Sequence, residues 1–170
     1  MATTSNDLKI YYSGATAAGG VQDNPLKSLG GFRSAVIVPN SRVDNLFDSV
    51  GMLETKDGQE TCYCVILKNN HITDAIENLN LYISGKQTFE TIKFGVSIPA
   101  VTDGEVQLMA SPYELPYNVD FYEAYTVGTK LTLIASLTAG KTIALWLNRI
   151  IATTESQMIH GELSLVFDWT

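Results

Sequence analysis

The last third of the chain most constrains the fold, because its apolar residues repeat with the two-residue period of a β-strand. Over residues 163–169 the odd positions are large and apolar, and the even positions Ser164 and Asp168 are polar. One face of this segment is therefore expected to pack on a core. Residues 142–151 are apolar at odd and even positions alike, which indicates a central strand covered on both sides. Arg149 interrupts its inward face, so we expect the strand to leave the core at Asn148 and Arg149.

Similar short patterns recur along the rest of the chain, separated by turn signals such as Asp57-Gly58, Asp103-Gly104 and Ala139-Gly140. No strand–helix–strand alternation accompanies them. They predict an all-β fold, an antiparallel two-sheet β-sandwich of jelly-roll or immunoglobulin-like type, as a single domain over residues 1–170. It would have about eight or nine strands and one short helix over residues 41–50. The other expected strands are residues 8–12, 34–39, 60–71, 77–84, 91–99, 106–109 and 130–138.

A glycine-rich N-terminal loop at residues 13–31 interrupts this regular spacing. It is long for a compact domain, and long loops are usually functional or contact another chain. A disordered insert is the alternative interpretation. Both remain open from the sequence.

Charge and composition exclude several classes of partner and chemistry. The formal net charge of −7 disfavours binding to nucleic acid or to an anionic membrane surface, and no apolar stretch is long enough to cross a bilayer. Cys62 and Cys64 lie two residues apart on an expected strand, about 7 Å from each other and beyond ordinary disulfide reach, so we expect two reduced core residues. Only His71 and His160 could add nitrogen ligands, so we expect no metal site.

No catalytic motif and no cofactor-binding motif occurs in the chain. Paired carboxylates meet in space and leave no spacing pattern, so Glu105, Glu114, Asp120 and Glu123 remain candidates for such a pair. We therefore expect a non-enzymatic protein without catalytic residues or cofactors.

The candidate binding residues are four tyrosines between residues 113 and 125. Tyrosine offers contact area at low entropic cost together with a polar hydroxyl, and it is enriched in recognition surfaces. The alternative is that these rings cap one end of the β-core. The four residues are Tyr113, Tyr117, Tyr122 and Tyr125.

The order of these features resembles small accessory virion proteins of tailed bacteriophages. The resemblance rests on LKIYYSG, a glycine-rich loop reaching SLGG, an NLFDSV turn, the strand NLNLYIS, and AGKTIALWLNRII before a last strand. It leaves out residues 101–127. It implies a β-sandwich structural protein without catalytic residues, placed on the head as decoration or associated with the tail.

The expected function is thus that of a capsid decoration protein, made in the host cytoplasm and located in the virion. Its partners would be the major capsid protein or other virion proteins, and further copies of itself in a homo-oligomer. A tail or baseplate-associated virion protein and a carbohydrate-binding module are the alternatives. In the second, the tyrosine rings would stack on sugars.

Overall fold

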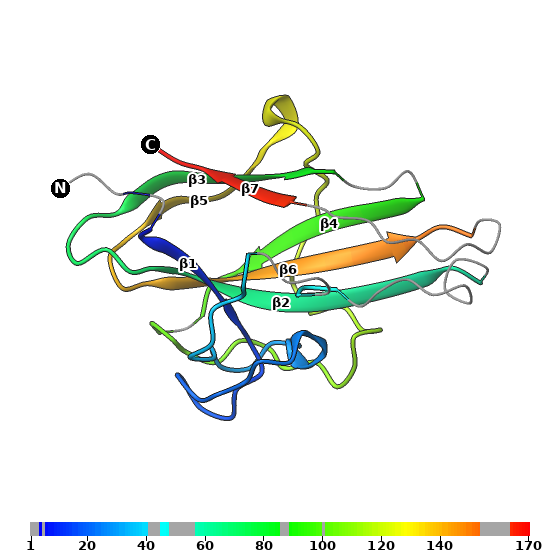
Figure 1. The fold of residues 1–170 in the computed structure, drawn as a ribbon, viewed down its shortest axis with the longest axis horizontal. Coiled ribbons are helices and arrows are strands. Elements are labelled where there is room, and N and C mark those ends of the chain that lie inside the picture. The colour runs from blue at the N-terminus through cyan, green and yellow to red at the C-terminus, as the bar shows by residue number, and fades with distance from the viewer. Residues whose placement is uncertain are drawn as a thin grey trace.

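Two antiparallel β-sheets pack face to face in the computed structural model of the protein (Figure 1). The structure describes residues 4, 6–40, 45–47, 57–85, 89–99, 101–153 and 164–170. One sheet has the strand order β1-β2-β6-β4 and the other β5-β3-β7. The predicted all-β architecture of two antiparallel sheets is therefore confirmed. The strands are β1 Leu8–Tyr12, β2 Gln59–Asn69, β3 Ile76–Ser84, β4 Glu90–Ser97, β5 Leu131–Leu137, β6 Thr142–Ile151 and β7 Ser164–Asp168.

The centre of the larger sheet is β6, which pairs with β2 on one side and β4 on the other. Its residues from Thr142 to Arg149 are all buried, as are those of β2 from Thr61 to Leu67. The expectation that residues 142–151 form a central strand is confirmed. Burial on both faces means that each face of this sheet must have its own cover.

The inner core fills the space between the two sheets. It takes alternate residues from facing strands, and most of them are completely inaccessible to solvent. Burying each such aliphatic side chain stabilises the fold by roughly 1.5–3 kcal/mol. Its members include Leu67, Ile76, Leu79, Leu81, Ile83, Ile92, Phe94, Leu145 and Leu147.

Two of the expected strands are absent from the described part of the chain. Residues 34–38 run beside β1, where the Tyr12 amide donates to Val36 O and the Val38 amide donates to Ile10 O, but they form only isolated bridges. Residues 106–109 contribute a single bridge, between Val106 and Gly31. The backbone N–H and C=O groups of these ordered loops therefore form individual hydrogen bonds and not the continuous ladder of a β-strand. The helix expected at residues 41–50 lies mostly outside the described residues. The described residues include two 3₁₀ turns, η1 Pro25–Lys27 and η2 Val127–Thr129.

The strand β6 does not leave the core at Arg149, so that expectation is wrong. Asn148 and Arg149 are 3% and 5% exposed, and the strand continues to Ile151. The Arg149 guanidinium lies 4.7 Å from the centre of the Phe47 ring. The negative face of an aromatic ring attracts a cation, and this attraction replaces part of the hydration that the cation loses on burial. The contact with Phe47 therefore helps to stabilise the buried charge of Arg149 in the sheet.

Candidate binding surface

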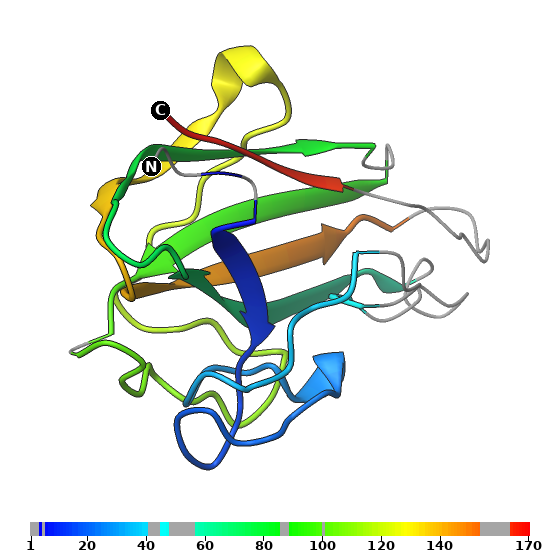
Figure 2. The same ribbon diagram turned by 60° about the vertical axis from the view of Figure 1, so that its left-hand side comes forward.

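A layer of two long loops covers the face of the larger sheet opposite the inner core. We call residues 13–38 and 101–122 the loop layer. In Figures 1 and 2 most of this layer lies below the sheet, on the side away from β3, β5 and β7, whereas residues 34–38 rise along β1, where Val38 joins the inner core. Between the layer and the sheet lies a second, outer core centred on the fully buried Trp146. Its other members are Cys62, Cys64, Ile66, Val106, Met109 and Ala144.

The two cysteines are free and buried, as the sequence predicts. Burial raises the pKa of Cys62 to about 12, with a smaller contribution from nearby Glu60, and it also raises the pKa of Cys64. Their backbone amides anchor the loop layer, because Cys64 N donates to Ser28 O at 2.7 Å and Cys62 N to Pro112 O at 2.6 Å. The loops therefore continue the pairing of β2 beyond the end of β1.

Ser13 is the buried polar centre of the glycine-rich loop. Its hydroxyl donates to Cys64 O at 2.8 Å and accepts from the Gly30 amide at 3.0 Å. Its own amide donates to the Ser28 hydroxyl at 3.1 Å, and its carbonyl accepts from the side chain of Gln22. Buried polar groups satisfied in this way fix one loop conformation. Residues 13–31 are thus a folded part of the protein, and the interpretation as a disordered insert is wrong.

Gly30 allows the two loops to meet over Trp146. Its φ is +93°, and a Cβ atom there would lie 1.8 Å from Gln107 O and 2.9 Å from Trp146 Cη2. No side chain fits at that distance. Glycine is therefore required where the 13–38 loop crosses the 101–122 loop.

A charged cluster around Asp103 ties the two loops to the sheet. Its carboxylate accepts from Arg33 Nε at 2.5 Å and from Lys68 Nζ at 2.9 Å, and its amide donates to the Thr142 hydroxyl at 3.3 Å. Partial burial raises the pKa of Asp103, but hydrogen bonds and positive charge from Arg33 and Lys68 outweigh burial and hold it below its usual value. Arg33 also lies 4.6 Å from the ring centre of Tyr11.

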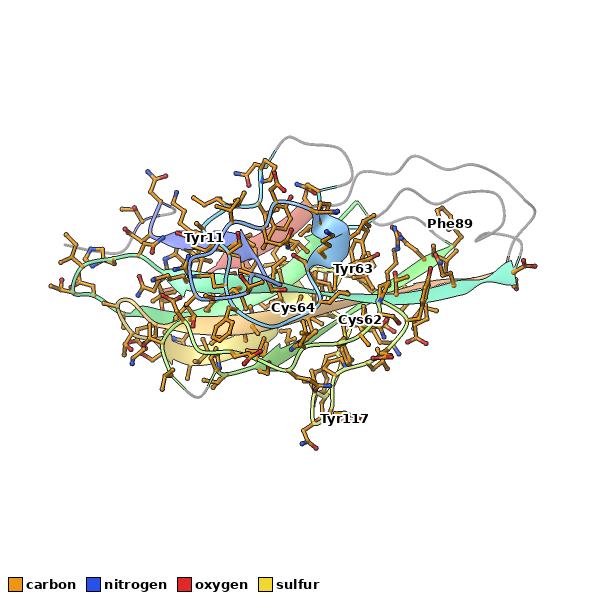
Figure 3. The ribbon with its side chains drawn as sticks, turned by 90° about the horizontal axis from the view of Figure 1, so that it is seen from below. Tyr11, Cys62, Tyr63, Cys64, Phe89 and Tyr117 are labelled. Carbon is orange, nitrogen blue, oxygen red and sulfur yellow. The ribbon has the colours of Figure 1, made fainter. Side chains whose placement is uncertain are left out.

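The outward side of the loop layer exposes large apolar side chains. Val21 is 83% exposed and Tyr117 is 81% exposed. Figure 3 shows Tyr117 projecting away from the strands. Exposed apolar side chains on a rigid base are typical of surfaces that bind other molecules. The other exposed members of the loop layer are Leu26, Ile37, Val101, Leu108, Tyr113, Leu115 and Tyr122.

The four predicted tyrosines occupy different environments. Tyr113 and Tyr117 are exposed on the loop layer, and the Tyr113 hydroxyl lies 3.4 Å from Gln59 Nε2. Tyr122 is 54% exposed at the edge of β4, where its backbone pairs with Phe94. Tyr125 is half-buried against the inner core, and its hydroxyl accepts from the Ile92 amide at 3.2 Å. Tyr125 thus caps the core, as the alternative interpretation has it, whereas the other three are accessible.

Tyr122 borders a cleft of about 220 Å³ between the edges of β4 and β5. Asn118, Asp120 and Thr132 add amide, carboxylate and hydroxyl groups to its lining, and Gly95, Val96, Leu131 and Leu133 complete it. Asn118 has a φ of +56°, a turn conformation that Asn tolerates well. Asp120 and Tyr122 were separate candidates from the sequence, and the fold adds the edges of β4 and β5 to form one cleft with them.

The sequence also named four acidic residues and two histidines. Glu105, Glu114, Asp120 and Glu123 are all exposed, and Glu114 accepts from the Ala110 amide at 3.2 Å. Within the described residues, no group of three or more His, Cys, Asp or Glu side chains could hold a metal ion. His71 Nδ1 accepts from the amides of Thr73 and Asp74 in a turn, and His160 lies outside the described residues.

No model of a protein family, no curated protein and no solved structure matches this chain. In the part of the chain that the structure describes, no helix has the length and apolar character needed to span a membrane.

Replacing Gly30 by alanine should destabilise the protein by about 3 kcal/mol or more. The new methyl group combines left-handed backbone strain with a clash against Gln107 O. Gly19→Ala is the matched control: its φ is +76° but no atom lies within 4 Å, so only strain of about 1 kcal/mol is expected. Urea unfolding monitored by Trp fluorescence measures the free energy of unfolding of both variants. Equal losses in the two variants would contradict the packing of the two loops over Trp146.

Replacing Asp103 by asparagine should lower the free energy of unfolding at pH 7 by about 1 kcal/mol, because Arg33 and Lys68 lose their counterion at a partly exposed site. A carboxyl with a lowered folded-state pKa stabilises above its unfolded pKa, and that stability is lost as the pH falls through the folded value. The difference between wild type and variant should therefore shrink below pH 3.8, the usual pKa of the group.

Unfolding titrations at pH 7 and below pH 3.8 test this dependence. Asp23→Asn, at an exposed acid of the same loop layer, should show neither effect. A loss in Asp103→Asn that does not change with pH would show that charge pairing is not its cause.

Proposed function

We propose that the protein is a non-enzymatic structural component of a bacteriophage virion that decorates the capsid. It would bind the lattice of the major capsid protein through the exposed side of the loop layer. The proposal rests on one observation: Val21, Tyr113 and Tyr117 are exposed on loops that are themselves well anchored. The hydrogen bonds of Ser13 and Asp103 hold these loops to the sheet. The resemblance to accessory virion proteins, noted from the sequence, supports the same role.

A rigid base favours binding because little conformational entropy is lost when the side chains are covered. Aromatic side chains seated on such a base are the usual anchors of protein interfaces. A lattice presents many equivalent sites, so if the protein is oligomeric, modest affinity per copy is sufficient when several contacts form together. A repeating partner suits this surface better than a single small ligand does.

We also propose a jelly-roll-like connectivity for the sandwich. From β2 to β7 each successive strand lies in the opposite sheet. Jelly rolls connect most of their strands across the two sheets, whereas immunoglobulin domains keep several hairpins within one sheet.

Replacing Tyr117 by alanine should weaken binding to assembled capsids at least about tenfold, since a buried aromatic anchor typically contributes more than about 1 kcal/mol. The loss of affinity is measured by co-sedimenting purified wild type or variant with assembled capsids that do not contain this protein. Ile72→Ala, which removes another exposed apolar side chain (92% exposed) in the turn between β2 and β3, should bind as wild type. Absence of the chain from intact particles by mass spectrometry would contradict a virion role, and density at the tail or baseplate would favour the tail-associated alternative.

A carbohydrate-binding module is the second candidate function, and the cleft beside Tyr122 favours it. An aromatic ring with amide, carboxylate and hydroxyl groups suits a polyhydroxylated ligand. The cleft of about 220 Å³ has room for little more than one sugar ring. Glycan-array binding that is lost in Tyr122→Ala but kept in Tyr113→Ala would support this function. The Tyr122 contact to Phe94 uses backbone atoms, so the substitution should leave that contact in place.

A further inference from the structure

The outer edge of β7 carries backbone groups that point away from the sheet. β7 pairs with β3, and Leu165 lies opposite Ile83. The Ile83 amide donates to Ala124 O at 2.7 Å, on the side of β3 away from β7. In an antiparallel ladder hydrogen-bonded and non-hydrogen-bonded pairs alternate. Leu165 and Phe167 are therefore in non-hydrogen-bonded pairs, and their N–H and C=O groups face outward.

These outward groups have no hydrogen-bond partner in the described part of the chain. The edges of the other sheet are covered: residues 34–38 bond along β1, and the Tyr122 backbone and Tyr125 hydroxyl bond along β4. The edge strand β5 has a register shift opposite Leu79 and Asn80, an irregularity that discourages further pairing. β7 pairs with β3 in unbroken register.

The inward face of β7 is also incompletely covered. Leu165 and Phe167 pack against the inner core but are only half-buried, whereas their partners Ile83 and Leu81 on β3 are 1% and 0% exposed. In Figures 1 and 2 β7 lies on the near side of β3 with no other strand in front of it. A strand added at this edge would satisfy the backbone groups and cover these side chains.

We propose that β7 pairs with β7 of a second copy of this chain, antiparallel and about a two-fold axis at Val166. This arrangement places Leu165 opposite Phe167 of the second copy and Phe167 opposite its Leu165. Each of these two pairs exchanges both of its backbone hydrogen bonds. The smaller sheets of the two copies then form one continuous sheet, and the apolar side chains at the edge pack on each other across the axis.

The charges of β7 are compatible with this self-pairing. In the proposed register Asp168 lies opposite Ser164 of the second copy, so the two carboxylates do not face each other. Asp168 is already paired with Lys130, whose Nζ lies 2.9 Å from its Oδ2. This inference does not depend on the proposed binding of capsids, because it uses a different surface.

The test places a charge on the two-fold axis. Val166 is half-buried and, unlike Leu165 and Phe167, does not pack against the inner core, so Val166→Lys leaves that core in place while two lysines face each other in the dimer. Like charges directly opposite in a strand pair are destabilising. Wild type should reach a mass twice 18.6 kDa in sedimentation equilibrium at up to about 100 µM, as suits a small interface. Val166→Lys should raise the dimer dissociation constant at least about tenfold.

Two further variants locate the contact. Val166→Glu alone should dissociate in the same way, and an equimolar mixture of the Lys and Glu variants should recover dimers, because opposite charges then meet at the axis. Ala135→Lys puts the same charge on exposed Ala135 of β5, the other edge strand of this sheet, and should dimerise as wild type. Circular dichroism verifies that each variant is folded.

A folded wild type that stays monomeric at about 100 µM in 0.5 M NaCl, where repulsion between the acidic chains is screened, would overturn the inference. So would a dimer weakened by Ala135→Lys and not by Val166→Lys. A monomer whose binding to capsids is weakened by Val166→Lys would assign the β7 edge to a virion protein instead of a second copy, and would likewise overturn it.

Discussion

The whole structure depends on the burial of both faces of β2 and β6. Trp146 and Cys64 point to one side of the larger sheet and Leu145 and Val65 to the other, and all four are out of contact with water. The second sheet covers one side. The loop layer must cover the other, since leaving Trp146 exposed would forfeit several kcal/mol of apolar burial. The loops are therefore a structural layer of the protein as well as its exposed surface, and their shape is set by the sheet beneath them.

Loops that cover a sheet lack the regular hydrogen bonds that helices and strands provide for backbone N–H and C=O groups. Here buried side chains bond to these backbone groups instead. Ser13 serves both loop and strand, and Ser34 donates to Gln22 O while accepting from the amides of Gln22 and Val36. Asp103 supplies charge at the point where the second loop reaches β2 and β6. Short polar side chains thus replace the regular ladder that would otherwise hold these segments.

The sequence predicted the parts of the fold whose signal is local. Alternation identified β3, β4, β5 and β7, and apolar residues on both faces identified β2 and the central β6. Residues 34–39 are also rich in β-branched residues but follow β1 through isolated bridges, which a propensity pattern cannot distinguish from a ladder. Arg149 was expected to leave the core because no sequence signal pairs it with Phe47, a contact made across the fold. The tyrosines were candidates from the sequence, but which of them are exposed and which one caps the core depends on how the chain returns along β4. The cleft joins Gly95 and Val96 of β4 to residues 118–122 and 131–133, a later part of the chain, so spacing could not predict it.

Because the loop layer is secured from its inner side, its outer positions are nearly independent of folding. A change at Tyr117 or Val21 alters what the surface can recognise while Ser13, Gly30 and Trp146 keep the scaffold in place. Most surface substitutions away from such contacts change stability by less than about 0.5 kcal/mol. A lineage carrying this fold can therefore diversify its specificity through point mutations at the tips, and selection on recognition need not oppose selection on folding.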